Sequence, residues 1–149
     1  MQEAMHAAIL APAAVLVLWT LIMLGWMGLT WIPALGGVAG LGKAPPGGRG
    51  QDLETVLPPR INWKSHNYSH LTEQPTLFYA VIMILALMGA DRIDVALAWG
   101  YVGLRIVHSL WQALVNRIPV RFALFALYSG SLIVLAIRAA ADCFAVMGR

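Results

Sequence analysis

The sequence predicts an all-α integral membrane protein built as a bundle of four transmembrane helices. Of its 149 residues, 60% are hydrophobic and only 11% are charged, whereas charged residues make up roughly 25% of a soluble domain. Three apolar runs, at 7–32, 95–114 and 120–147, are long enough to cross a bilayer as helices. A fourth run at 77–90 is shorter and crosses only if the polar residues before it are included.

The chain is short enough to form a single domain over residues 1–149. A loop at about 35–61 separates the first two helices, because its Gly-Gly and Pro-Pro pairs cannot continue a helix. A tight turn at 89–94 makes the second and third helices antiparallel neighbours, and Pro119 suits the first turn of the last helix. The expected helices are at about 6–32, 63–90, 94–115 and 119–147.

The entry to the second helix is the most informative segment. The run at 77–90 covers only about 21 Å as a helix, against roughly 30 Å of hydrocarbon. The span must therefore begin near His70, which places His70 and Glu73 at or below the headgroup boundary. Ionisable side chains are costly there and are kept mainly where they bind or react.

Basic residues indicate how the chain is oriented. Most of them lie in or beside the first and third connections, which predicts that these connections are cytoplasmic and that both termini are outside. The formal charge of +3 then reflects membrane orientation rather than nucleic-acid binding. Near the outer end of the last helix, Arg138 and Asp142 are spaced to pair with each other. The cytoplasmic basic residues are Lys43, Arg49, Arg60, Lys64, Arg117 and Arg121.

Polar side chains from three helices are predicted to meet in the cytoplasmic half of the bundle. The second and third helices each carry a polar face whose members are three or four residues apart. Arg121, in the first turn of the fourth helix, reaches the same depth. The two faces comprise His66, Asn67, His70 and Glu73 on the second helix, and Arg105, His108 and Gln112 on the third.

Three interpretations fit this cluster. Arginines suit carboxylates and Glu73 suits an ammonium group, so a small zwitterion with extra acid groups would bind, beside an apolar second substrate from the lipid. Alternatively, Arg105 and Glu73 pair with each other and only hold the bundle together. The third interpretation is a metal site formed by His66, His70, Glu73 and His108, although no HExxH spacing is present.

Three segments occur in a fixed order along the chain and together resemble one known family. They are Glu73-Gln-Pro75-Thr-Leu-Phe78, then Tyr101-Val-Gly-Leu-Arg105-Ile-Val-His108, then Asn116-Arg-Ile-Pro119-Val-Arg121-Phe-Ala-Leu-Phe125. The chain is similar to the bacterial branch of the MAPEG superfamily, the membrane-associated proteins of eicosanoid and glutathione metabolism. The resemblance implies a homotrimer in a bacterial inner membrane, with glutathione sites between neighbouring subunits that face the cytoplasm.

The resemblance also implies roles for individual residues. Glu73 matches the glutamate that binds the γ-glutamyl amine of glutathione. Arg121 looks like the arginine that stabilises the thiolate, a role that is physically sensible because a nearby cation lowers a thiol pKa. The basic residues usual at the end of the first helix are absent, where the sequence reads Trp31-Ile-Pro33. The other implied glutathione contacts are His66, Asn67, His70, Arg105, His108 and Gln112.

The predicted function is glutathione-dependent transfer to lipophilic electrophiles at the membrane, or reduction of lipophilic peroxides. Glutathione is then a co-substrate, and Arg121 is the catalytic residue. The alternative is a non-enzymatic membrane protein that binds an anionic small molecule or a lipid headgroup at the same intersubunit site. Saturable thiol conjugation would favour the enzyme, and binding without turnover would favour the alternative.

Overall fold

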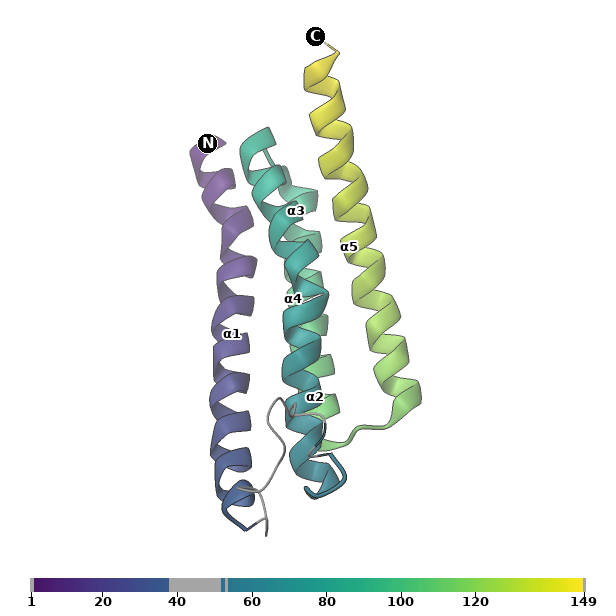
Figure 1. Ribbon diagram of the computed structural model, residues 1–149. Coiled ribbons are helices and arrows are strands. Elements are labelled where there is room, and N and C mark those ends of the chain that lie inside the picture. The colour runs from purple at the N-terminus through teal and green to yellow at the C-terminus, as the bar shows by residue number, and fades with distance from the viewer. Residues whose placement is uncertain (1, 38–51, 53, 149) are drawn as a thin grey trace.

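The computed structural model describes residues 2–37, 52 and 54–148, which form an all-helical bundle (Figure 1). The prediction of an all-α protein is confirmed. Most of the expected loop at 35–61 lies outside the described residues. Among these residues, four helical stretches are long and apolar enough to cross a membrane, and α2 and α3 together make one of them. The helices are α1 (Gln2–Gly36), α2 (Pro59–Glu73), α3 (Pro75–Met88), α4 (Arg92–Leu114) and α5 (Ile118–Met147).

Local sequence explains where α3, α4 and α5 begin and end. α3 ends at Gly89, whose φ of 103° is a left-handed conformation that glycine adopts without strain. α4 begins with a capping box, in which the Asp91 carboxylate accepts from the backbone N–H groups of Ile93 and Asp94, and Asp94 accepts from that of Asp91. α5 has Pro119 in its first turn, where a missing N–H breaks no helical hydrogen bond.

The helical hydrogen bonding of the second membrane span is interrupted at Gln74, whose backbone angles, φ −62° and ψ −38°, remain helical. α2 begins at Pro59, before the expected start near residue 63, and ends at Glu73, with α3 beginning at Pro75. Pro75 has no backbone N–H, so it cannot continue the hydrogen-bond ladder of α2. The hydroxyl of Thr76 donates to the carbonyl of Glu73 at 2.6 Å, which satisfies part of the interrupted backbone. The span therefore consists of a polar segment, α2, followed by an apolar segment, α3.

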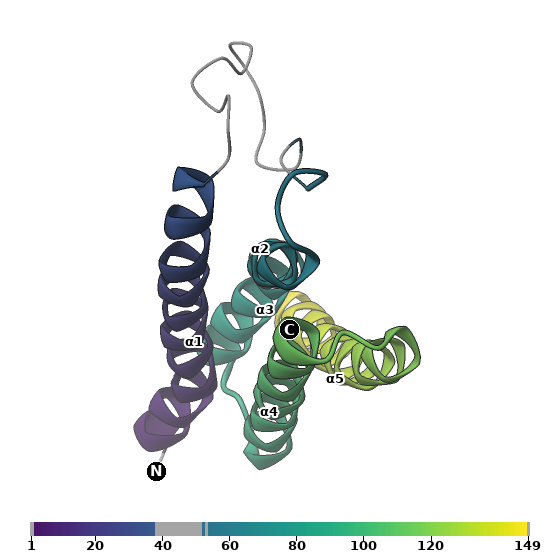
Figure 2. The ribbon, with the colours of Figure 1, turned by 90° about the horizontal axis from the view of Figure 1, so that it is seen from below.

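The helices are arranged around α4. α4 packs against α5, α1 and α2, and α5 also packs against α3. Figure 1 and Figure 2 show α1 and α5 on opposite sides of the group formed by α2, α3 and α4. Both chain ends lie at the same end of the bundle (Figure 1). Which side of the membrane that end occupies stays a prediction from the distribution of basic residues.

An aromatic layer separates the apolar core from the polar end of the bundle. The rings of Phe78 and Tyr101 stack with centroids 4.2 Å apart, and Tyr128 meets Tyr101 edge-on at 5.6 Å. On the side toward the chain ends, α3 and α5 continue with buried apolar residues such as Ile82 and Leu135. On the other side of the layer lie the polar residues of α2 and α4.

Arg138 joins α5 to the turn between α3 and α4. Its Nη2 lies 2.7 Å from Asp91 Oδ2, and its Nε donates to the buried carboxylate of Asp94. The predicted pairing of Arg138 with Asp142 is therefore wrong. The two carboxylates of the capping box converge on one guanidinium, which can bind both with several N–H groups at once.

Candidate functional site

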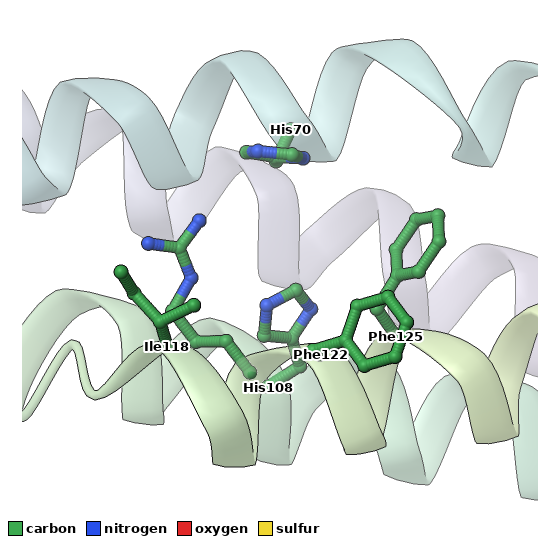
Figure 3. Close-up of a pocket in the computed structure, with 6 residues that line it drawn as sticks. His70, His108, Ile118, Phe122 and Phe125 are labelled. Carbon is green, nitrogen blue, oxygen red and sulfur yellow. The ribbon is translucent and has the colours of Figure 1, made fainter.

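A cavity lies where α2, α4 and α5 meet, on the polar side of the aromatic layer. Its volume is about 320 Å³, at the lower end of the roughly 300–1,000 Å³ that ligand pockets occupy. Figure 3 shows His70 on one side of the cavity and His108 on the other. The cavity is lined by His70 of α2, His108 of α4, and Ile118, Arg121, Phe122 and Phe125 of α5.

The turn between α4 and α5 positions Arg121, the charged side chain in the cavity lining. Asn116 follows the end of α4 with a φ of 56°, and its N–H donates to the carbonyl of Trp111 at 2.7 Å. Asparagine tolerates this left-handed conformation better than most residues. Its side-chain oxygen accepts from Arg121 Nη1 at 2.6 Å, while Arg121 Nε has no hydrogen-bond partner among the described residues. The turn therefore holds the guanidinium in place and leaves one of its donors unpaired.

α4 carries a stripe of buried polar residues toward the same cavity. Tyr101, Arg105, His108 and Gln112 are all buried, and their spacing places them on one helical face. An unpaired buried polar group costs roughly 1–3 kcal/mol, so several together favour a binding role over a purely structural one. The atoms without a hydrogen-bond partner in the described part of the chain include the Tyr101 hydroxyl, Arg105 Nε and Nη2, His108 Nε2 and both amide atoms of Gln112.

Arg105 lies in the wall behind the cavity. Its side chain is 0% exposed, and its Nη1 lies 3.1 Å from His108 Nδ1. The guanidinium carbon lies 5.3 Å from the centre of the Tyr128 ring. The purely structural interpretation requires an ion pair between Arg105 and Glu73. The ion pairs found among the described residues do not include this one. A buried cation held only by neutral groups is costly, which favours a binding role.

The polar face of α2 is divided between the cavity and its surroundings. His70 lines the cavity, and Glu73 lies beside it with Oε2 3.8 Å from His70 Nδ1. The Glu73 side chain is 67% exposed and stands at the edge of the cavity rather than in its lining. His66 is directed elsewhere, because its Nε2 lies 2.7 Å from Glu54 Oε1. Only the second half of this face therefore adjoins the cavity.

A hydrogen-bonded network fixes α2 against α1 and α4. The Ser109 hydroxyl accepts from Asn67 Nδ2 at 2.8 Å and from Trp19 Nε1 at 3.0 Å. At the start of α2, Asn62 Nδ2 donates to the carbonyl of Glu54 at 2.9 Å, so the segment before α2 folds back onto the helix. These contacts hold the α2 backbone that carries His70.

The sequence-predicted residues therefore fall into four groups. The structure places His70, His108 and Arg121 around one cavity, while Glu73 stands at its edge and His66 contacts Glu54. The others are buried in the adjoining helices, namely Asn67, Arg105 and Gln112. Within residues 2–37, 52 and 54–148, no three His, Cys, Asp or Glu side chains lie close enough together to ligate one metal ion.

The site also includes residues that the sequence interpretation missed. Asn116 holds Arg121, Tyr128 packs against His108 with ring centroids 5.4 Å apart, and Phe122 and Phe125 line the cavity. The sequence contains a signal for two of these residues, Phe125 and Tyr128. Phe125 and Tyr128 follow Arg121 by four and seven residues, which places all three on one face of α5.

A second, more apolar cavity adjoins the first between α3 and α5. Its volume is about 450 Å³, and Phe125 lines both cavities. Its polar groups come from Gln74 and Ser129, whose side chains are hydrogen-bonded at 2.8 Å. The remaining lining residues are Leu77, Ala80, Val81, Leu132, Ile133 and Ala136.

Comparison with known protein families agrees with this architecture. The model of the MAPEG family matches residues 9–141, a range that contains every residue lining the two cavities. No curated protein and no solved structure matched the chain. The four apolar helical stretches and this match make the protein an integral membrane protein. Because the family match extends over most of its length, the chain belongs to the MAPEG family.

Proposed function

We propose that the protein is a membrane-bound enzyme that uses glutathione to modify lipophilic electrophiles or to reduce lipophilic peroxides. The observation that carries the proposal is the position of Arg121. Its guanidinium lines a cavity whose other walls are aliphatic, phenyl and imidazole groups, and its Nε has no partner among the described residues. Membership of the MAPEG family supports glutathione as the molecule that binds there.

Glutathione matches the charges around the cavity. It has two carboxylates, one ammonium group and a thiol. Glu73, exposed at the cavity edge, supplies a negative charge for the ammonium group. Arg105 supplies a buried positive charge, and the amides of Gln112 and Asn67 offer further hydrogen-bonding atoms without a partner in the described residues. These groups favour a ligand that carries both signs of charge over a simple apolar molecule.

Arg121 would activate the thiol. A guanidinium beside sulfur stabilises the thiolate and lowers the thiol pKa from about 8.5 toward neutrality. The thiol proton passes to water, the sulfur forms a bond to an electrophilic carbon, and the leaving group departs with the bonding electrons. With a hydroperoxide, the thiolate attacks the terminal oxygen and the O–O bond breaks, which gives a sulfenic acid and an alkoxide that takes a proton from water to become an alcohol. A second glutathione then converts the sulfenic acid into a disulfide and water.

The second cavity offers a place for the lipophilic substrate. It is lined mainly by apolar residues of α3 and α5, and it meets the first cavity at Phe125. An apolar molecule dissolved in the bilayer would reach this groove without crossing water. Its reactive end would then lie next to the residues that hold the thiolate.

Replacing Arg121 tests the proposal directly. In Arg121→Ala, the thiol pKa of bound glutathione should return toward ~8.5, so the thiolate fraction at pH 7 should fall by about tenfold. The measurement is the ultraviolet absorbance of the thiolate, titrated against pH in the detergent-solubilised protein. Arg117→Ala is the matched control, because Arg117 is an exposed arginine near the start of α5 that does not line the cavity.

Binding is measured separately by the rise in melting temperature that glutathione causes. Arg121→Ala should keep most of this rise, whereas Glu73→Gln should reduce it because the ammonium group loses its counter-charge. If glutathione binds to the wild-type protein but no conjugation or peroxide reduction occurs, the non-enzymatic alternative is correct. If both variants only lower thermal stability and leave the glutathione response unchanged, these residues are structural and the proposal is wrong.

A further inference from the structure

The hydrogen bonds of His108 determine which of its ring nitrogens carries the proton. Arg105 Nη1 and the Tyr128 hydroxyl both lie 3.1 Å from His108 Nδ1. A guanidinium has only N–H donors and no acceptor. His108 Nδ1 must therefore accept the hydrogen bond from Arg105, so its ring proton is on Nε2. The same argument requires the imidazole to be neutral, because a protonated ring has N–H donors at both nitrogens.

The protonated nitrogen of His108 is the one without a partner. His108 is only 2% exposed and lines the cavity, and its Nε2 has no hydrogen-bond partner among the described residues. His70 approaches the ring from the opposite side of the cavity, with ring centroids 6.3 Å apart (Figure 3). The residues that line the cavity thus include a neutral N–H donor on α4 and the cationic donor Arg121 on α5.

Arg105 determines the tautomer of His108 through its contact with Nδ1. It is buried beside the Tyr128 ring, and Tyr128 in turn stacks on His108 with centroids 5.4 Å apart. The ring of His108 is therefore held in its plane by Tyr128 and in its tautomer by Arg105. A positive charge on one side of an imidazole also polarises the N–H on the other side, which strengthens the bond that it donates.

We infer that His108 donates its Nε2–H to the sulfur of bound glutathione, and that Arg105 is the positioning residue that fixes this tautomer. The inference rests on the proposed function for the identity of the acceptor. Among the anionic atoms of glutathione, the polarisable thiolate is the easiest to remove from water, and Phe122 and Phe125 line the same cavity. His108 stabilises the thiolate but does not take its proton, because Nε2 is already protonated and Nδ1 accepts from Arg105.

The tautomer can be tested without glutathione. Solid-state NMR on the full-length protein in lipid, with isotope-labelled histidine, reports which nitrogen of each ring is protonated. The His108 signals are identified by their absence in His108→Gln. We expect the Nε2–H form in the wild-type protein and in Arg117→Met. In Arg105→Met the donor to Nδ1 is lost, so a mixture of tautomers should appear.

A second variant keeps this test decisive if Arg105→Met does not fold. Tyr128→Phe removes the other contact with Nδ1 and leaves Arg105 in place, so the Nε2–H form should persist. A wild-type ring protonated on Nδ1, or a tautomer that depends on Tyr128 but not on Arg105, would overturn the role of Arg105. This result does not depend on whether glutathione is the substrate.

The contact with sulfur is tested by titrating bound glutathione. His108→Phe keeps a ring that can stack on Tyr128 but has no N–H, so the thiolate fraction at pH 7 should fall by roughly tenfold. His108→Gln keeps an N–H donor on its side chain and should restore part of the loss. Equal thiolate fractions in the wild-type protein and His108→Phe would overturn the contact. If the wild-type protein binds no glutathione, the proposed function and the sulfur contact both fail, while the NMR result still decides the role of Arg105.

Discussion

Two arginines of this protein have opposite surroundings. Arg138 contacts two carboxylates, Asp91 and Asp94, and so has its charge balanced within the chain. Arg105 is completely buried and contacts the neutral His108 and the ring face of Tyr128. A buried charge without a counter-charge destabilises a fold, whereas a paired one can be close to neutral. The contrast fits a structural role for Arg138 and supports the proposed role of Arg105 in the site.

The carboxylate of Asp91 should make stability depend on pH. Its pKa lies below the usual range, because the backbone N–H of Asp94 donates to it, with further bonds from Ile93 and Arg138. A group with a lower pKa in the folded state stabilises fully above its unfolded pKa of about 3.9, and this contribution is lost as the pH falls through the folded value. Asp91→Asn keeps the helix cap but loses the charge.

Unfolding of Asp91→Asn in detergent should therefore be compared with the wild-type protein across pH. At neutral pH the variant should be less stable by up to about 1 kcal/mol, and the difference should shrink below pH ~4. Asp142→Asn is the control, because Arg138 pairs with Asp91 and Asp94 instead of Asp142. A difference that stays constant down to pH 2–3 would mean that the Asp91 charge adds nothing to stability.

At the scale of the elements, the interrupted second span links the membrane interior to the site. Its apolar part, α3, packs in the core through Phe78 and Ile82. Its polar part, α2, carries His70 and Glu73 in its last turn, just before the interruption at Gln74. Because a proline ring clashes with the turn that precedes it in a helix, Pro75 affects how these two side chains are placed.

Replacing Pro75 should separate stability from binding. Pro75→Ala restores a backbone N–H, so α2 and α3 can join into one continuous helix, and the melting temperature should stay the same or rise. His70 and Glu73 would shift relative to α4 and α5, and the dissociation constant for glutathione should increase at least several-fold. Pro12→Ala, which removes a proline inside α1, is the control. An unchanged glutathione affinity would show that the break does not serve the site.

At the scale of the whole molecule, one side of the bundle is poorly suited to face lipid. The side chains of His70 and Glu73 are 39% and 67% exposed on a membrane-spanning stretch. Ionisable groups are costly when they meet lipid, and packing against another copy of the chain relieves that cost. This exposure supports the homotrimer that the family resemblance implies, with the cavity edge covered by a neighbouring subunit.

We therefore expect the protein to be trimeric in mild detergent. Native mass spectrometry should show a species of three times 16.2 kDa. Chemical cross-linking in native membranes, before any detergent is added, should give the same stoichiometry and exclude association caused by solubilisation. A monomer in both experiments would contradict the trimer and leave Glu73 exposed to the membrane surface.

Much of the architecture was determined by the sequence alone. The apolar runs are continuous and local, so four membrane-spanning stretches and an all-α fold follow from hydropathy and length. Helical periodicity also placed Arg105 and His108 on one face of the third span, and the family resemblance agrees with the match over residues 9–141. These features depend on neighbours within a few turns of the chain.

The tertiary structure alone decided which polar groups meet. Arg138 contacts carboxylates 44 and 47 residues away rather than Asp142, four residues along its own helix. Glu54 pairs with His66, and Arg105 reaches the cavity through His108 instead of lining it. Periodicity defines the face on which a side chain lies, but contacts between helices depend on their rotation, tilt and relative depth. Those quantities are set by packing over the whole bundle, where shifts of a few ångströms exchange one hydrogen-bond partner for another.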